Sequence, residues 1–243
     1  PALGALMPAL YRDLFTDATE GTLTSMLASQ GGHWVLWGVA VSLVGIAVCG
    51  KAGLIKEREV PEAVKFASIS EFSVAKGMLV AVSAGVLSAC FSYGISAGRP
   101  LAAAAVEHGA NSLFQNNVTF MVIMWGGLTT NGLWCLWLNW RNRTFHNYTD
   151  RSTPLFRNYL LVACAGTLWF LQFFFYGMGE SRLQNDASSW VLHMSFIIIV
   201  SNCWGLYFRE WQGTSATNKS VLVAGIAVIL GAIAMVGYGN YLG

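Results

Sequence analysis

Residues 168–208 decide the fold class, because they contain two apolar segments, LWFLQFFFYGMG (168–179) and SSWVLHMSFIIIVSNCWGLYF (188–208). The short polar run at residues 180–186 joins them. Either segment alone could be a buried core helix. Together they are too long, too aromatic and too close together for that. Two such helices with so short a connection are typical of a chain that crosses a lipid bilayer twice.

The composition of the whole chain agrees with a membrane protein. Of its 243 residues, 55% are hydrophobic and 11% are charged, whereas soluble domains are about 25% charged. Charge-free stretches of the roughly 20 residues that a spanning helix needs occur at 77–98, 111–140, 158–179, 187–208 and 220–243. We therefore predict an all-α polytopic membrane protein that lies in the lipid bilayer. A net charge of +2 gives no indication of a nucleic-acid partner.

The sequence predicts six full transmembrane helices and a helical stub. The stub is residues 1–11, and the spans are 33–50, 77–98, 116–138, 158–178, 189–207 and 220–242. Because the chain starts at Pro1 and the stub resembles the end of a helix, we expect an N-terminally truncated fragment. In the first span, Gly38, Ser42 and Gly45 form a face of small residues, which predicts close packing against another helix.

The distribution of Lys and Arg predicts the orientation. The basic loops 51–76 and 139–157 alternate with loops that hold one basic residue each. Those poorly basic loops are 12–32, 99–115 and 179–188. By the positive-inside rule, loops 51–76, 139–157 and 208–219 are cytoplasmic and the C-terminus is outside.

An internal repeat connects the first and last spans. VLWGVAVSLVGIAVCG (35–50) resembles VLVAGIAVILGAIAMV (221–236), with Gly45 aligned to Gly231. The two copies run in opposite directions, which is typical of the inverted repeats of secondary transporters. Because the copies are five helices apart, we expect a ten-helix protein. Residues 1–50 would end its first half, 51–76 would be a cytoplasmic basic loop, and 77–243 would be its second half.

Several segments resemble one known family. They are LWFLQFFFYGMGESRL (168–183), SSWVLHMSF (188–196), GLIKERE (53–59) and RPLAAAAVEHG (99–109). They are similar to the bacterial L-rhamnose–proton symporters of the drug/metabolite transporter superfamily, and the resemblance covers essentially the whole chain. It implies ten helices in two inverted halves. It also implies an inner-membrane secondary transporter that imports L-rhamnose, or a related 6-deoxy sugar, with protons.

A sugar-binding face is predicted on the segment around residue 172. Trp169, Gln172, Tyr176 and Glu180 lie at steps of three, four and four, within about 80° on a helix. Sugars bind planar hydrogen-bonding groups and aromatic faces, and Trp169, Gln172 and Tyr176 offer both. In the alternative interpretation, Gln172 bonds a neighbouring helix and the rings only pack.

Glu180 and His193 are the candidates for proton coupling. His193 lies within a predicted span, where an ionisable side chain is a functional hypothesis by default. In the alternative, His193 is satisfied by Ser189 one turn earlier. Glu180 lies at the outer end of its helix, where a solvated carboxylate would cost little, and the sequence favours that interpretation.

A second polar patch lies around Asn131, a further candidate for binding the substrate, with Thr130 and Trp134 nearby. Asn202 is about 180° from His193 on a straight helix. At least one of that pair is therefore expected to bond a neighbouring helix. Glu107 and His108 are expected in a solvated outer loop; the alternative is that they line the entrance to the site.

Other classes of function remain as alternatives to sugar import. An exporter or other transporter of a different small metabolite, from the same superfamily, is the nearest. A membrane enzyme acting on lipid-linked sugars would need acidic or histidine clusters at the membrane surface, and a sensor subunit would need a soluble domain. The sequence has neither feature, so we expect no enzyme. It also has no motif for a cofactor or a metal.

Overall fold

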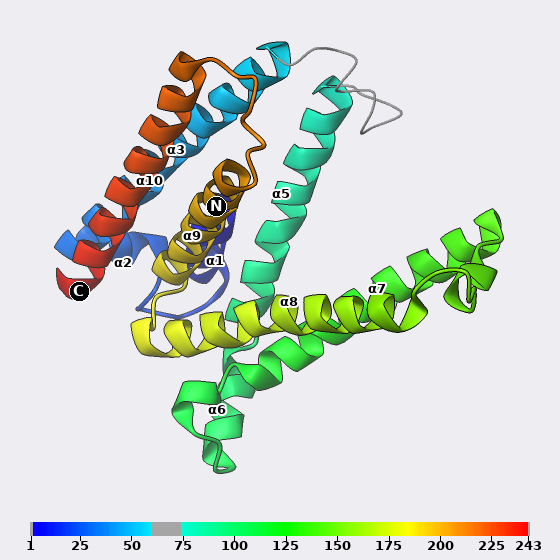
Figure 1. Ribbon diagram of the computed structural model, residues 1–243. Coiled ribbons are helices and arrows are strands. Elements are labelled where there is room, and N and C mark those ends of the chain that lie inside the picture. The colour runs from blue at the N-terminus through cyan, green and yellow to red at the C-terminus, as the bar shows by residue number, and fades with distance from the viewer. Residues whose placement is uncertain (1, 60–73, 243) are drawn as a thin grey trace. The chain divides into compact units, whose positions relative to one another are not determined.

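The computed structural model describes residues 2–59 and 74–242, which fold into helices joined by short connections. The helices in order are α1 (Ala2–Phe15), α2 (Leu23–Ala28), α3 (Gln30–Glu59), α5 (Val74–Ala97), α6 (Arg99–Glu107), α7 (Asn117–Asn142), α8 (Leu155–Leu183), α9 (Asp186–Tyr207) and α10 (Ala216–Leu242), with 3-10 turns η1 (Ser112–Phe114) and η2 (Phe145–Tyr148). The all-α prediction is confirmed (Figure 1).

Five helical regions among the described residues are long and apolar enough to cross a membrane. They are Gln30–Glu59, Lys76–Glu107, Leu155–Leu183, Asp186–Tyr207 and Ala216–Leu242. The predicted span 116–138 is helical as expected and forms α7, but its composition does not place it among these five regions. A bilayer-crossing role for α7 therefore stays a prediction.

The helices extend beyond the apolar segments that predicted them. α3 begins at Gln30 and ends at Glu59, so it includes residues that the sequence placed in the loops 12–32 and 51–76. Lys, Glu and Arg are good helix formers, and hydrophobicity alone does not detect their contribution. The predicted loop 99–115 likewise contains α6 and η1. Residues 60–73 of the predicted basic loop lie outside the described residues.

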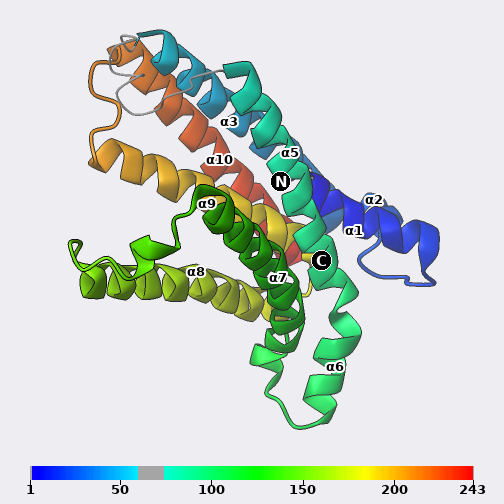
Figure 2. The ribbon, with the colours of Figure 1, turned by 90° about the vertical axis from the view of Figure 1, so that its right-hand side faces the viewer.

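The described residues divide into two compact units. The first comprises those within Pro1–Tyr93 and Asn185–Gly243, and α3 packs antiparallel to α10 at its centre (Figure 2). A Cβ added at Gly45 would lie 2.6 Å from Ile229 Cγ1, and one added at Gly38 would lie 3.1 Å from the Ala232 carbonyl oxygen. The predicted face of small residues is therefore confirmed as a helix-packing surface.

The two ends of this unit agree with the predicted topology. At one end, the Glu59 carboxylate accepts hydrogen bonds from the Ser215 N–H at 2.8 Å and the Ser215 hydroxyl at 2.6 Å. These residues lie in the predicted cytoplasmic loops 51–76 and 208–219. At the other end, Arg12 Nη2 lies 3.2 Å from Asp186 Oδ2, and both residues belong to predicted outer loops.

The aligned glycines of the internal repeat have different surroundings. Gly45 is buried against α10, whereas a Cβ added at Gly231 would have no described atom within 4 Å. The two copies run antiparallel, as the repeat predicts, but this pair of glycines does not have the same packing role. The ten-helix inverted repeat stays a prediction.

The second unit, Gly94–Gln184, contains α6, α7 and α8. α6 begins after Gly98, and Pro100 occupies its first turn, where a missing N–H leaves no helical hydrogen bond unmade. The Thr119 hydroxyl, on the first turn of α7, donates to the Gly98 carbonyl at 3.0 Å. This bond ties the start of α6 to the start of α7, next to the C-terminal part of α8.

Candidate functional site

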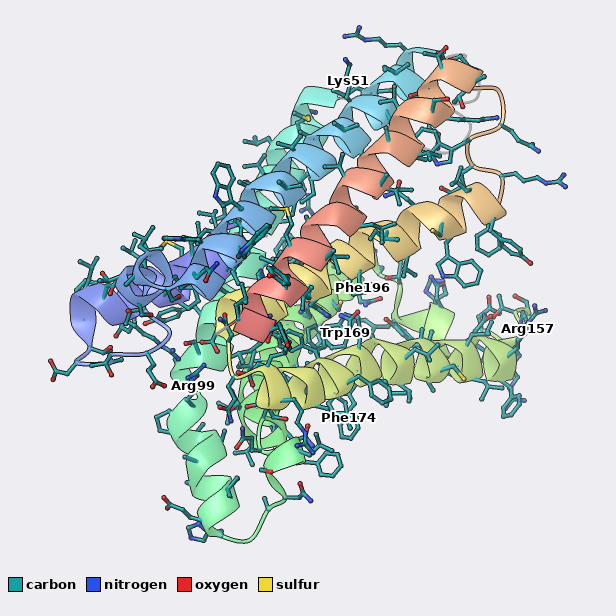
Figure 3. All side chains as sticks on the ribbon, turned by 90° about the vertical axis from the view of Figure 1, so that its left-hand side faces the viewer. Lys51, Arg99, Arg157, Trp169, Phe174 and Phe196 are labelled. Carbon is teal, nitrogen blue, oxygen red and sulfur yellow. The ribbon has the colours of Figure 1, made fainter. Side chains whose placement is uncertain are left out.

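The predicted sugar-binding face lies on the C-terminal half of α8, in the second unit. Its four residues become less exposed along the helix. Trp169 is 57% exposed, Gln172 and Tyr176 are half-buried, and Glu180 is 6% exposed. Figure 3 labels Trp169 and Phe174 on this helix. The face therefore leads from an exposed aromatic ring to a buried carboxylate.

Aromatic rings line the same part of the unit. The Trp169 and Phe173 rings meet edge to face, with centroids 5.1 Å apart. Phe120 of α7 is 1% exposed, and its ring centroid lies 6.3 Å from that of Tyr176. Gly177 lets the two helices approach, because a Cβ there would lie 3.3 Å from Asn116 Cβ. Aromatic faces of this kind can bind the C–H surfaces of a sugar ring.

Glu180 is the charged residue of this face, and its carboxylate is enclosed by groups from other segments. Its carboxylate oxygen Oε2 accepts a hydrogen bond from Asn116 Nδ2, and the same amide nitrogen donates to the Gly177 carbonyl at 3.1 Å. Arg99 Nη2 lies 4.0 Å from the other oxygen, Oε1. The interpretation of Glu180 as a solvated carboxylate is therefore wrong. The sequence suggested it because Glu180 is near a helix end, but tertiary contacts enclose that end.

Arg99, Asn116 and Thr119 are parts of this arrangement that the sequence did not single out. Arg99 was counted only as the one basic residue of its predicted loop. Asn116 and Thr119 lie at the start of an apolar helix, where polar residues usually serve as caps. The sequence could have indicated the role of Arg99. An arginine between Gly98 and Pro100 lies at a helix break, where its side chain can reach a neighbouring helix.

Asn131 lies apart from the Glu180 cluster. It is exposed, and its amide donates to the Gly127 carbonyl of its own helix at 2.9 Å. Fifteen residues of α7 separate it from Asn116, which is about 22 Å along a helix axis. Thr130 similarly donates to its own helix, to the Gly126 carbonyl at 3.0 Å. The predicted second polar patch is therefore present on α7 but is not joined to Glu180.

His193 belongs to the first unit, on α9. It is half-buried, and its ring centroid lies 6.2 Å from that of Trp190. The Ser189 hydroxyl is buried and has no hydrogen-bond partner among the residues that the structure describes, so the alternative in which Ser189 satisfies His193 is wrong. Asn202 donates to the Ile198 carbonyl of its own helix at 2.8 Å.

Glu107 and His108 are exposed, as the sequence predicted, and His108 Nδ1 lies 2.8 Å from the Ala104 carbonyl oxygen. Over residues 2–59 and 74–242, no group of three or more His, Cys, Asp or Glu side chains could hold a metal ion. The side chains of the α8 face and Glu180 can form hydrogen bonds, pack through their aromatic rings and exchange a proton.

Comparison with known proteins decides the family. Residues 5–241 match the family described as L-rhamnose-proton symport protein (RhaT). The chain belongs to this family. It is therefore a multi-pass membrane protein of a bacterial symporter family, and the family is one of transporters, not of enzymes. The resemblance seen in the sequence is confirmed.

Individual symporters show the same relationship. The chain is 35% identical over 234 residues to the L-rhamnose-proton symporter of Yersinia pestis (strain Pestoides F). It is 35% identical over 231 residues to that of Salmonella typhi. Each match covers 93% of this chain and 66% of the relative, so the chain spans just under two thirds of the relatives' length. No solved structure matches.

Proposed function

We propose that the protein imports L-rhamnose, or a related 6-deoxy sugar, together with protons across the bacterial inner membrane. Membership of the symporter family over residues 5–241 carries this proposal. Helices long and apolar enough to cross a bilayer support it. In our proposal, these helices belong to a ten-helix transporter with two inverted halves. Residues 1–50 end the first half, 51–76 form a cytoplasmic loop, and 77–243, with α7 as a further span, form the second half.

The sugar is proposed to bind along the α8 face. The Gln172 amide can both donate and accept hydrogen bonds, which suits sugar hydroxyls. Trp169 and Tyr176 supply ring faces for the C–H surfaces, and the methyl group of a 6-deoxy sugar needs an apolar wall of the kind that Phe173 and Phe120 form. Asn131 is a further candidate contact from α7. Alternating access would expose the site to one side of the membrane and then to the other.

Proton coupling is proposed for Glu180 and His193. Ionisable side chains within membrane helices are rare, and in transporters they commonly serve as proton relays. Glu180 is buried with a charged neighbour, and His193 is half-buried. Either can bind and release a proton without another chemical change.

The test is rhamnose-driven proton uptake by the full-length protein in cells that lack other rhamnose transporters. Adding L-rhamnose should make a weakly buffered medium more alkaline, and radiolabelled rhamnose should accumulate. Gln172→Ala should reduce both signals by about fivefold or more, because a lost hydrogen bond to a sugar and an unpaired hydroxyl cost about 1–3 kcal/mol. His193→Ala should reduce the alkalinisation, because in the proposal the His193 side chain takes part in moving protons.

A matched control is Thr167→Ala on the same helix. Thr167 is exposed and donates only to its own helix, to the Ala163 carbonyl at 2.9 Å, so this variant should transport like the wild type. If rhamnose caused neither alkalinisation nor uptake by the wild type, the proposed substrate would be wrong, and a transporter of another metabolite would take its place. Unchanged transport by Gln172→Ala would move the sugar site away from α8.

A further inference from the structure

We propose that Glu180 carries the coupling proton and that Arg99 and Asn116 are positioning residues that hold its ionised form. Protonation of Glu180 would release Arg99 and so loosen the contact between the start of α6 and the end of α8. This inference rests on the proposed symport. It assigns the proton to one of two candidate residues and names the contacts that respond to it.

The two carboxylate oxygens of Glu180 have different neighbours. Oε2 accepts from the Asn116 amide, while Oε1 faces Arg99 Nη2 at 4.0 Å. The Asn116 amide is itself buried, at 6% exposed, and is fixed by its second donated bond to the Gly177 carbonyl. An ionised carboxylate is an acceptor only, so this arrangement fits the charged form of Glu180.

Glu180 is more deeply buried than its cationic neighbour. The Glu180 side chain is 8% exposed, whereas the Arg99 side chain is 42% exposed. A buried carboxylate that loses its cationic neighbour is strongly destabilised, unless it takes up a proton and becomes neutral. Released Arg99, by contrast, can be hydrated at its exposed side. Proton binding and separation of the pair are therefore expected to occur together.

The proposed step is the reversible protonation of the Glu180 carboxylate. A proton from water on the predicted outer side binds one carboxylate oxygen of Glu180, forming an O–H bond and removing the negative charge. The guanidinium of Arg99 stays protonated throughout. When the site faces the cytoplasm, the O–H bond breaks, the proton leaves to water, and the ion pair forms again. No other bond is made or broken.

The position of Arg99 explains how this change could move a helix. Arg99 is the first residue of α6, directly after Gly98, where the chain leaves α5. Figure 3 labels Arg99 at this junction. The junction is held on the other side by the Thr119 bond to the Gly98 carbonyl. Loss of the Arg99–Glu180 pair would leave that bond as a pivot, so that α6 could turn about an existing break.

On the described elements next to this end of α8, few charged groups other than Arg99 lie near Glu180. η1 contains no titratable side chain, and the α7 residues near Asn116 are also uncharged. On α6, Glu107 is eight residues beyond Arg99, about 12 Å along the axis. On α8 itself, Tyr176 lies one turn earlier on the same face. Arg182 is exposed, and two residues from Glu180 it points about 160° away. Among the charged groups of η1, α6, α7 and α8, Arg99 is therefore the one that lies beside the Glu180 carboxylate.

The experiment uses the full-length protein in proteoliposomes and compares two kinds of transport. Accumulation of L-rhamnose driven by a pH gradient requires proton movement. Exchange of labelled for unlabelled rhamnose at equal pH does not. Glu180→Gln imitates the neutral, protonated side chain. It should keep exchange within about threefold of wild type and lose at least tenfold in gradient-driven accumulation. Glu107→Gln, an exposed carboxylate on α6, should keep both.

The positioning residues are tested by the pH profile of accumulation. Arg99→Gln removes the charge that favours ionised Glu180, so the pH of half-maximal accumulation should rise by about one unit or more. Arg99→Lys should restore much of the wild-type profile. Asn116→Leu removes a donor to the same carboxylate and should move the profile in the same direction. Arg182→Gln should leave it unchanged.

Three results would overturn the inference. Wild-type accumulation by Glu180→Gln would show that another group carries the proton. Loss of exchange together with accumulation in Glu180→Gln would show that Glu180 serves structure or sugar binding instead. An unshifted pH profile in Arg99→Gln would remove the proposed role of the pair. If the wild type showed neither accumulation nor exchange of rhamnose, the proposed function itself would fail and this inference with it.

Discussion

Replacing Gly45 with alanine should weaken the packing of α3 on α10. An ideal Cβ at Gly45 would lie 2.6 Å from Ile229 Cγ1, 3.0 Å from the Ile229 backbone nitrogen and 3.2 Å from the Gly225 carbonyl oxygen. Ordinary contacts begin at 3.4 Å. The Ile229 side chain can rotate away, but both backbone atoms can only move if the helices separate by a few tenths of an ångström.

We expect this displacement to cost about 1–3 kcal/mol, the usual cost of overpacking a well-packed core. For a chain of this size, each kcal/mol corresponds to about 2–4 °C in Tm. Gly45→Ala should therefore lower the Tm of the purified protein in detergent by at least about 2 °C, and Gly45→Val should lower it further. Thermal unfolding followed by the loss of a monodisperse peak in size-exclusion chromatography measures this difference.

Gly231→Ala is the matched control. It makes the same substitution at the aligned position of the other repeat copy, where a Cβ would have no described atom within 4 Å. Alanine is also the better helix former, so this variant should be neutral or slightly stabilising. Equal Tm values for Gly45→Ala and Gly231→Ala would refute the packing argument. A larger loss for Gly231→Ala would place the critical helix contact on the opposite side of α10.

Three further predictions concern the helix ends, the second unit and the orientation. Ser215→Ala removes the hydroxyl that accepts from the Asn218 N–H at 3.1 Å at the start of α10 and donates to the Glu59 carboxylate at 2.6 Å. It should cost about 1 kcal/mol in thermal unfolding, whereas Ser220→Ala on the exposed side should cost little. Gly177→Ala, which would bring a Cβ to 2.5 Å from the Phe120 ring, should destabilise the protein by about 1–3 kcal/mol, and Gly179→Ala, with no described atom within 4 Å, should not. In a variant without native cysteines, Asp17→Cys should react with an impermeant maleimide added outside intact cells, and Thr217→Cys should react only after permeabilisation. The opposite labelling pattern would reverse the predicted topology.

Local patterns were sufficient to predict most of the helices. Most described residues of each charge-free stretch lie in a long helix, because in lipid a segment can satisfy its backbone hydrogen bonds by forming one. The residues at which the helices begin and end were less well predicted. α3 continues to Glu59 through residues that are polar but favour helix, and α6 lies in a segment predicted as a loop. Hydrophobicity does not report helix propensity, so these extensions were missed.

The candidate site was predicted only in part. The spacing of Trp169, Gln172, Tyr176 and Glu180 was enough to place them on one face, because helical periodicity is local. The environment of each was not predictable in that way. Asn131, which looked like a second part of the site, bonds its own helix. The hydrogen bond from Ser189 to His193, which was the alternative to a functional histidine, is not formed.

The amino-acid sequence by itself determined that the chain is an α-helical membrane protein of the L-rhamnose–proton symport family, because hydrophobic length and family motifs are properties of contiguous residues. Only the tertiary structure decided that Glu180 is buried against Asn116, 64 positions away, and near Arg99. It also decided that Gly45 packs on another helix, whereas its aligned counterpart Gly231 does not. Burial and ion pairing depend on which segments meet in space, and similar local sequences can meet different neighbours.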